Sequence, residues 1–217
     1  NEAINISKMF LRENALRIFK LEGKDDSYDN IEVLKNPGAI HDWWELHNSK
    51  VGFISSWKVI GTFDFGSGLE NIYPPESEIL FSERYSGKGG MVKWETENIS
   101  SSGYLNLISI MSKRNTNVSP RAEGIAYAYA EVESPDDREA KMTLGSNDGA
   151  KMWINNEVVY NKHAARNAIA DQEMLTVKLT KGKNKILVKI ENLGASWGLF
   201  LRVINPKNDL EIIQFED

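Results

Sequence analysis

Hydrophobic and polar residues alternate in short runs along most of the chain from about residue 57 onward. A period of two places successive side chains on opposite faces of a strand, so each run predicts a strand with one buried face. Clusters of Gly, Pro, Ser and Asp separate the runs, and no helical crossover is expected between them. The pattern predicts a mainly β protein built as an antiparallel β-sandwich. The expected strands span residues 57–63, 91–97, 104–109, 123–132, 139–145, 150–155, 174–179, 184–191, 197–204 and 210–215.

The clearest single element is the segment 144–156, where a polar turn leads into an alternating strand that ends in a second polar turn. We expect Gly145 and Gly149 to adopt backbone angles that are closed to other residues. Alternate residues from position 150 to 154 are apolar and predict a core-facing side. The opposite side carries Trp153, so this strand is expected to present an aromatic ring on a surface.

The first part of the chain has a different pattern. Apolar residues at helical spacing between about residues 4 and 21 predict a helical segment that Gly23 ends. The connector that follows contains the adjacent pair Trp43 and Trp44. They either form a platform for a sugar or, the commoner role, one closes the end of the sandwich and the other packs against the linker. We therefore divide the chain into a helical segment 1–22, a connector 23–50 and a β-sandwich domain 51–217.

The composition excludes several classes of function. The chain has 217 residues, of which 41% are hydrophobic and 26% charged, as in ordinary globular proteins. A net charge of −5 argues against general nucleic-acid binding and against attraction to an anionic membrane. No apolar run approaches the roughly 18 residues that span a bilayer. The absence of cysteine removes disulfides, thiol nucleophiles and cysteine-type zinc sites.

Catalytic motifs are not apparent. The three histidines, at positions 41, 47 and 163, do not have the spacing of a His-Glu-x-x-His metal site. There is no Gly-x-Ser-x-Gly elbow and no phosphate-binding loop. The many carboxylates do not form a recognisable acid–base pair of the kind that glycoside hydrolysis requires. We therefore expect no catalytic site within this chain.

Binding residues are expected at and after the segment 144–156. Sugars offer apolar C–H faces to aromatic rings and hydroxyls to polar side chains, and loops between strands commonly carry such residues. In this prediction Trp153 stacks on a sugar, and His163 and Arg166 donate hydrogen bonds. The alternative is that Trp153 packs against neighbouring aromatics and the loop is merely solvated, whereas Trp57, Trp94 and Trp197 are expected in the core. The predicted ligand-binding residues are Trp153, Asn156, Tyr160, His163 and Arg166.

A structural calcium ion is the one cofactor that the sequence leaves open. Calcium takes six to eight oxygen ligands from carboxylates and carbonyls. The segments 134–137 and 147–148 contain such groups, but both are also typical of polar turns that satisfy their own backbone. No other cofactor is expected.

Several blocks together resemble the galactose-binding-like jelly rolls that are appended to bacterial hydrolases. The resemblance implies an accessory, non-catalytic carbohydrate-binding module of a larger bacterial hydrolase, located outside the cell or in the periplasm. The chain departs from the usual pattern at Asn147, where the family has Asp, and at Asn156, where it has Gly. The blocks are residues 57–63 (WKVIGTF), 85–90 (YSGKGG), 127–130 (YAYA), 145–156 (GSNDGAKMWINN), 179–189 (LTKGKNKILVK) and 197–202 (WGLFLR).

A second resemblance concerns the amino-terminal segment. Residues 6–19 (ISKMFLRENALRIF) are similar to the last helices of amidohydrolase-type hydrolases, which often end in Asn-Ala-x-Arg-Leu-Phe. This similarity implies a catalytic barrel upstream of the sandwich, as a partner of the module. Two alternatives remain: a purely structural sandwich that packs on a catalytic domain, and a small hydrolase in its own right.

Overall fold

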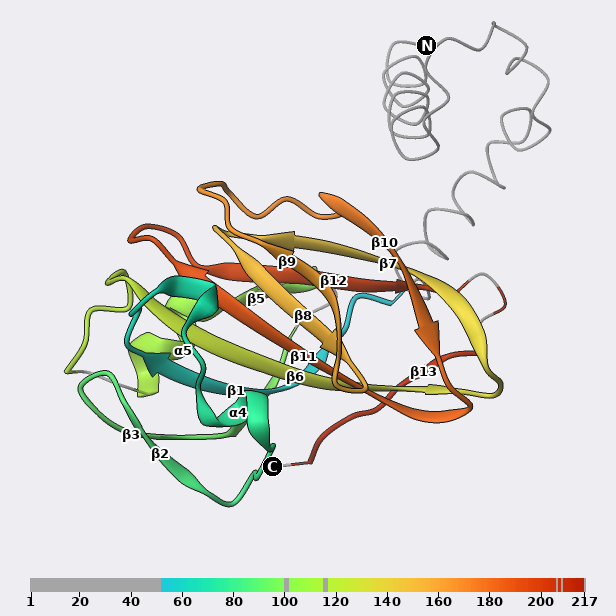
Figure 1. Ribbon diagram of the computed structural model, residues 1–217, viewed down its shortest axis with the longest axis horizontal. Coiled ribbons are helices and arrows are strands. Elements are labelled where there is room, and N and C mark those ends of the chain that lie inside the picture. Colours follow the sequence, from blue (N-terminus) through green and yellow to red (C-terminus); the bar gives the residue numbers. More distant parts are fainter. Residues whose placement is uncertain (1–51, 100–101, 115–116, 206, 208, 217) are drawn as a thin grey trace, which may run out of the picture. The chain divides into compact units, whose positions relative to one another are not determined.

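Two antiparallel β-sheets face each other across a core of aliphatic side chains (Figure 1). The computed structural model describes residues 52–99, 102–114, 117–205, 207 and 209–216, which belong to the compact unit Asn48–Asp217. This architecture confirms the predicted mainly β sandwich with antiparallel strands. The helical segment 1–22, the connector 23–50 and the amidohydrolase-like string lie outside the described residues.

The larger sheet has seven strands, in the order β4-β1-β6-β11-β8-β9, and β13 adds to β6 beyond the end of its pairing with β1. The central pair is β6 and β11, which remain in antiparallel register over their full lengths, from Gly182 opposite Ser134 to Asn192 opposite Gly124. The strands are β1 (Ser56–Phe63), β4 (Glu95–Asn98), β6 (Gly124–Ser134), β8 (Ala150–Ile154), β9 (Glu157–Lys162), β11 (Gly182–Asn192) and β13 (Glu211–Ile212).

The smaller sheet has four strands in the order β10-β7-β12-β5. These are β5 (Tyr104–Asn106), β7 (Arg138–Ser146), β10 (Glu173–Leu179) and β12 (Gly198–Ile204). The helix α5 (Leu107–Arg114) follows β5 directly and buries Leu107, Ile110 and Met111 against the same core. Because β9 lies in one sheet and β10 in the other, the loop 163–172 crosses from sheet to sheet at this edge of the sandwich.

Small aliphatic and large aromatic residues alternate along β6, which explains why the larger sheet is buried on both faces. Its alanines at positions 126, 128 and 130 face the core between the sheets, together with Val132. Tyr127 and Tyr129 point to the outer face, where they join a second apolar cluster. The period of two thus separates small aliphatic residues from large aromatic ones on a single strand.

Residues 64–94 cover part of this outer face. They contain the short helices η2 (Gly68–Glu70) and α4 (Pro74–Ser77) and the hairpin of β2 (Arg84–Gly87) with β3 (Gly90–Lys93) (Figure 1). Tyr73 stacks on Phe63 with ring centroids 4.7 Å apart, and Phe81 packs edge-on against Tyr129 at 5.2 Å. We call residues 64–94 the cover segment.

Most predicted strands are present, with three differences. Residues 107–109, expected to continue a strand, begin helix α5, whose apolar positions 107, 110 and 111 have helical spacing. The strand expected at 91–97 is divided between β3 and β4 at Trp94. β2 and β9 were not predicted, because their exposed, polar sequences carry little apolar periodicity.

Candidate functional site

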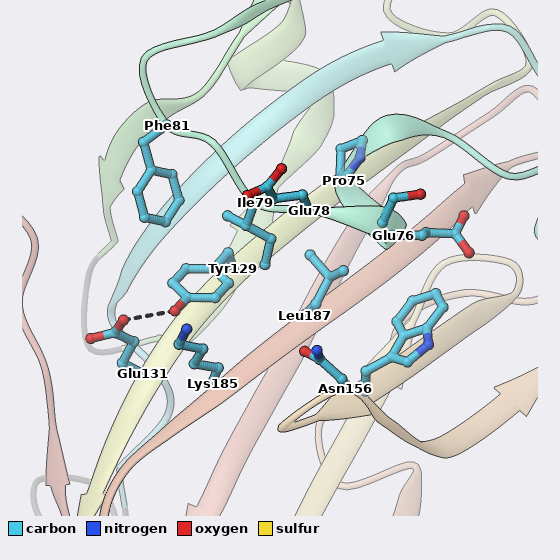
Figure 2. A pocket seen from close by; sticks show the side chains of 12 residues that line it. Pro75, Glu76, Glu78, Ile79, Phe81, Tyr129, Glu131, Asn156, Lys185 and Leu187 are labelled. Atoms are coloured by element: carbon cyan, nitrogen blue, oxygen red, sulfur yellow. Dashed lines mark hydrogen bonds between the residues drawn. The ribbon is translucent and has the colours of Figure 1, made fainter.

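A hollow lies between the cover segment and the uncovered part of the larger sheet (Figure 2). Its volume is about 380 Å³, within the range of about 300–1,000 Å³ that is usual for small-molecule sites. One wall is the segment 75–81, and the sheet contributes residues of β6, β8 and β11 together with the turn after β8. The lining residues are Pro75, Glu76, Ser77, Glu78, Ile79, Phe81, Tyr129, Glu131, Trp153, Asn156, Lys185 and Leu187.

Three aromatic side chains line the hollow. Trp153 is half-buried on β8 and packs at the margin of the outer apolar cluster. Phe81 remains 40% exposed, and Tyr129 is buried beneath it. The ammonium of Lys151 lies 5.1 Å from the centroid of the Trp153 ring, a cation–π contact at a partly exposed site. The hollow therefore offers the aromatic and aliphatic surface on which the C–H face of a sugar can pack.

A buried network fixes the wall at Glu76. Its Oε1 accepts hydrogen bonds from the Tyr127 hydroxyl at 2.5 Å and from Lys189 Nζ at 2.9 Å. Lys189 is fully buried on β11, and its ammonium also donates to the carbonyls of Leu69, at 2.9 Å, and Asn71. Burial lowers the pKa of Lys189, whereas the contact with Glu76 acts in the opposite direction. This network fastens the cover segment to the sheet.

A second carboxylate at the other end of the hollow is also compensated. Glu131 Oε1 accepts a hydrogen bond from the Tyr129 hydroxyl at 2.7 Å (Figure 2). Its Oε2 lies 3.0 Å from Lys183 Nζ. Burial, followed by the hydrogen bond to Glu131, raises the pKa of Tyr129 well above its ordinary value. The phenol therefore remains protonated and holds the carboxylate in place.

The structure separates the five predicted ligand residues into two groups. Trp153 and Asn156 line the hollow, Asn156 at the turn between β8 and β9. Tyr160, His163 and Arg166 do not line it. Tyr160 instead packs against the core between the sheets, and the other two belong to the loop 163–172. A single small ligand in the hollow therefore contacts the first group alone.

Arg166 is committed to protein contacts. Its Nη1 donates to Glu173 Oε1 at 2.5 Å, and its Nη2 donates to Ser146 Oγ and to the Tyr160 hydroxyl, each at 3.1 Å. Burial raises the pKa of Glu173, but hydrogen bonds from Lys162 and Arg166 outweigh it and leave that pKa below its ordinary value. Arg166 thus ties the loop 163–172 to the edge of the sandwich.

His163 contacts a buried acid. Its Nδ1 lies 2.6 Å from Oε1 of Glu191, while 67% of the imidazole side chain is exposed. Glu191 itself is fully buried on β11, and burial raises the pKa of its carboxyl group. The histidine is therefore anchored at the start of the loop 163–172, with part of its ring in solvent.

The polar turn 145–149 organises the same loop. Both oxygens of Asp148 accept backbone hydrogen bonds, Oδ1 from Arg166 at 3.3 Å and Oδ2 from Leu193 at 2.7 Å. The predicted role of Gly145 and Gly149 was wrong: neither has a positive φ, and the left-handed residue here is Asp148, with φ 56°. The glycines are required for space, because a Cβ on Gly149 would lie 2.0 Å from Glu191 Oε1.

The segments considered for calcium have other contacts. Asp136 pairs with Arg138, and Asp137 accepts a backbone hydrogen bond from Lys181 at 2.6 Å. Within the part of the chain that the structure describes, no three His, Asp or Glu side chains are grouped to hold a metal ion. In the same part, no helix is long and apolar enough to cross a membrane.

The core tryptophans were predicted correctly, but only two of the twelve residues that line the hollow, Trp153 and Asn156, were among the predicted ligand-binding residues. Trp57, Trp94 and Trp197 are all buried. Six of the unpredicted lining residues come from the segment 75–81, which carries no strand or motif signal. Glu131 and Lys185 were also missed, because each resembles an ordinary solvent-facing residue of an alternating strand.

Comparison with known proteins finds only weak structural similarity. No protein-family model and no curated protein sequence matches this chain. Among solved structures, the PA14 domain of the MpAFP antifreeze protein matches with 12% identity and a TM-score of 0.33, over 43% of this chain and 50% of that one. β-Glucosidase from Kluyveromyces marxianus in complex with glucose matches with 10% identity and a TM-score of 0.39, over 75% of this chain and 17% of the enzyme.

β-Glucuronidase from Ruminococcus gnavus, in complex with uronic isofagomine, matches with 10% identity and a TM-score of 0.40, over 71% of this chain and 28% of the enzyme. The chain thus spans half of the PA14 structure and less than a third of either glycosidase. With TM-scores below 0.5, these similarities carry no argument about this chain.

Proposed function

We propose that this chain is a non-catalytic carbohydrate-binding module of a larger bacterial hydrolase and that the hollow beside Trp153 is its binding site. The observation that carries the proposal is the combination, in one hollow, of accessible aromatic surface with polar side chains at its margin. Trp153 and Phe81 supply apolar surface for a sugar face, and Asn156 supplies an amide that both donates and accepts hydrogen bonds.

The surrounding structure is suited to weak, reversible binding. The wall at Glu76 is held by Lys189 and Tyr127, so the site is largely formed before a ligand arrives. A preformed site avoids the cost of ordering side chains on binding. The galactose-binding-like resemblance supports the same proposal, and it extends the proposal to a catalytic domain elsewhere in the parent protein and to a location outside the cell or in the periplasm.

The proposal is tested by titrating the full 217-residue chain with a panel of neutral oligosaccharides and polysaccharides, using calorimetry and ligand-observed NMR. We expect dissociation constants of roughly micromolar to millimolar. Trp153→Ala should weaken binding at least about ten-fold, because it removes the largest aromatic surface of the hollow. Met174→Ala is the matched control, since Met174 is 43% exposed on β10 in the other sheet.

Three other results would each point to a different function or site. Binding that survives Trp153→Ala but is lost in His163→Ala would move the site to the loop 163–172. Absence of binding at millimolar sugar would contradict the proposal and favour a structural domain that packs on a catalytic partner. Release of reducing ends from a polysaccharide by the purified chain would instead identify a hydrolase.

A further inference from the structure

Two side chains of opposite charge line the hollow without an ion-pair partner among the residues that the structure describes. Glu78 is exposed on the cover segment, and Lys185 is exposed on β11. The remaining carboxylates of the hollow are already compensated, Glu76 by Lys189 and Glu131 by Lys183. The unpaired charges available to a ligand are therefore one carboxylate and one ammonium.

These two groups belong to different walls. Glu78 follows α4, above the floor formed by Leu187, whereas Lys185 extends from β11 beside Tyr129 and Glu131 (Figure 2). A ligand that occupies the hollow thus meets a hydrogen-bond acceptor on the cover segment and a donor on the sheet. A hydroxyl group satisfies either, because it both donates and accepts.

We propose that Glu78 and Lys185 together restrict the hollow to uncharged sugars and orient them; this inference rests on the proposed carbohydrate-binding function. A sugar carboxylate would be attracted to Lys185 but repelled by Glu78. An ammonium group would be attracted to Glu78 but repelled by Lys185. Selectivity that arises from unfavourable contacts with the wrong ligand is a general route to discrimination, and a neutral polyol avoids both repulsions.

Two variants are expected to change the preference of the hollow for charged sugars in opposite directions. Glu78→Gln removes the repulsion of a carboxylate and keeps an amide that can still bond a hydroxyl. Lys185→Gln removes the repulsion of an ammonium in the same way. Glu123→Gln and Lys178→Gln are the matched controls, because both residues are exposed and neither lines the hollow.

The probes are the methyl glycosides of glucose and galactose, the corresponding uronates and the corresponding 2-amino-2-deoxy sugars. Each is titrated by NMR into the full chain at low and at physiological ionic strength. The wild type should bind the neutral sugar more tightly than either charged analogue. Glu78→Gln should improve uronate binding relative to the neutral sugar by about two- to five-fold, and Lys185→Gln should do the same for the amino sugar. Added salt should reduce both effects.

The outcomes separate this inference from the function on which it rests. Neutral binding with equal or tighter binding of a charged analogue by the wild type would overturn the inference and leave the carbohydrate-binding function intact. The inference would also be overturned, with the function intact, if both variants shift the preference between charged and neutral sugars in the same direction. Variants that bind all the sugars as their controls do would overturn it too. Absence of binding by all of these sugars and by the oligosaccharide panel would overturn both.

Discussion

The Nδ1 atom of His163 lies 2.6 Å from Oε1 of Glu191, which is fully buried although 67% of the histidine side chain is exposed. Gly68 and Gly149 make room for the acid: an added Cβ would approach its carboxylate oxygens to 2.9 Å and 2.0 Å respectively. The buried carboxyl group thus places the start of the loop 163–172 beside the end of β11, a central strand of the larger sheet.

This relationship predicts how stability changes with pH. Burial raises the pKa of Glu191, and the nearby His163 only partly offsets this. An acid whose pKa is raised on folding contributes stability that is complete below its unfolded pKa and is lost as the pH rises through its folded pKa. We expect Glu191→Gln to gain free energy of unfolding relative to the wild type as the pH rises from about 4. Urea denaturation of both proteins between pH 4 and 8 measures the difference.

The control for this experiment is Glu123→Gln, which changes an exposed acid. Its free energy of unfolding should change with pH in the same way as that of the wild type. A wild type that instead gains stability over Glu191→Gln with rising pH would contradict the prediction. That result would mean that His163 stabilises the Glu191 anion by more than burial destabilises it.

Substitution of Arg166 tests whether this residue stabilises the fold or binds a ligand. Its guanidinium makes three hydrogen bonds within the protein, and its side chain is only 15% exposed. We expect Arg166→Ala to lower the free energy of unfolding by about 2–3 kcal/mol, because Glu173 and the Ser146 and Tyr160 hydroxyls lose a charged partner. Arg121→Ala, at an exposed position, should change it by less than about 0.5 kcal/mol. An affinity for sugar that falls in Arg166→Ala while stability is unchanged would contradict the structural role.

Gly145 is predicted to be intolerant of a side chain. A Cβ at this position would lie 1.9 Å from the carbonyl oxygen of Ile169, so the loop 163–172 would have to move away from β7. We expect Gly145→Ala to lower the free energy of unfolding by about 1–3 kcal/mol. Limited proteolysis should also show faster cleavage after Lys162 and Arg166. The comparison is Gly182→Ala, where the new methyl group meets nothing within 4 Å, although φ is +89°, and where this loop should remain protected.

The sequence predicted the parts of the molecule that depend on local periodicity. The alternation from Ala150 to Ile154 correctly placed Trp153 on the outer face, and the turn before it was correctly located. The period cannot show which distant segment lies over that face. The wall that contains Glu76 and Glu78 is some 75 residues away in sequence, and its position depends on tertiary contacts such as that between Glu76 and Lys189.

For the same reason, the sequence does not show which residues contact the predicted binding loop 163–172. Arg166 resembles an available hydrogen-bond donor until the fold brings Glu173 and Ser146 to it. Lys189 resembles one more exposed lysine of an alternating strand, yet it is fully buried. In both cases the local sequence does not show that the charged residue is held within the protein, because the charge that compensates it, or the segment that covers it, comes from elsewhere in the chain.

The last prediction concerns Lys189, which holds in place the cover segment that forms one wall of the hollow. Its ammonium holds the carbonyls of Leu69 and Asn71 and the carboxylate of Glu76. Removing one member of a buried ion pair leaves an uncompensated charge, at a cost of about 3–5 kcal/mol. We expect Lys189→Met to lower the free energy of unfolding by this amount. It should also accelerate amide hydrogen exchange in residues 69–81 more than in β7.

The double variant Lys189→Met/Glu76→Gln distinguishes loss of charge balance from loss of packing. With the acid neutralised, no unpaired charge remains, and the glutamine can still accept the hydrogen bond from Tyr127. Replacing both members of a buried pair is often far less destabilising than replacing one, so the double variant should recover most of the lost stability. If it is as unstable as Lys189→Met, the lysine acts through its bonds to the carbonyls of Leu69 and Asn71. The cover segment would then depend on those two bonds rather than on the pairing with Glu76.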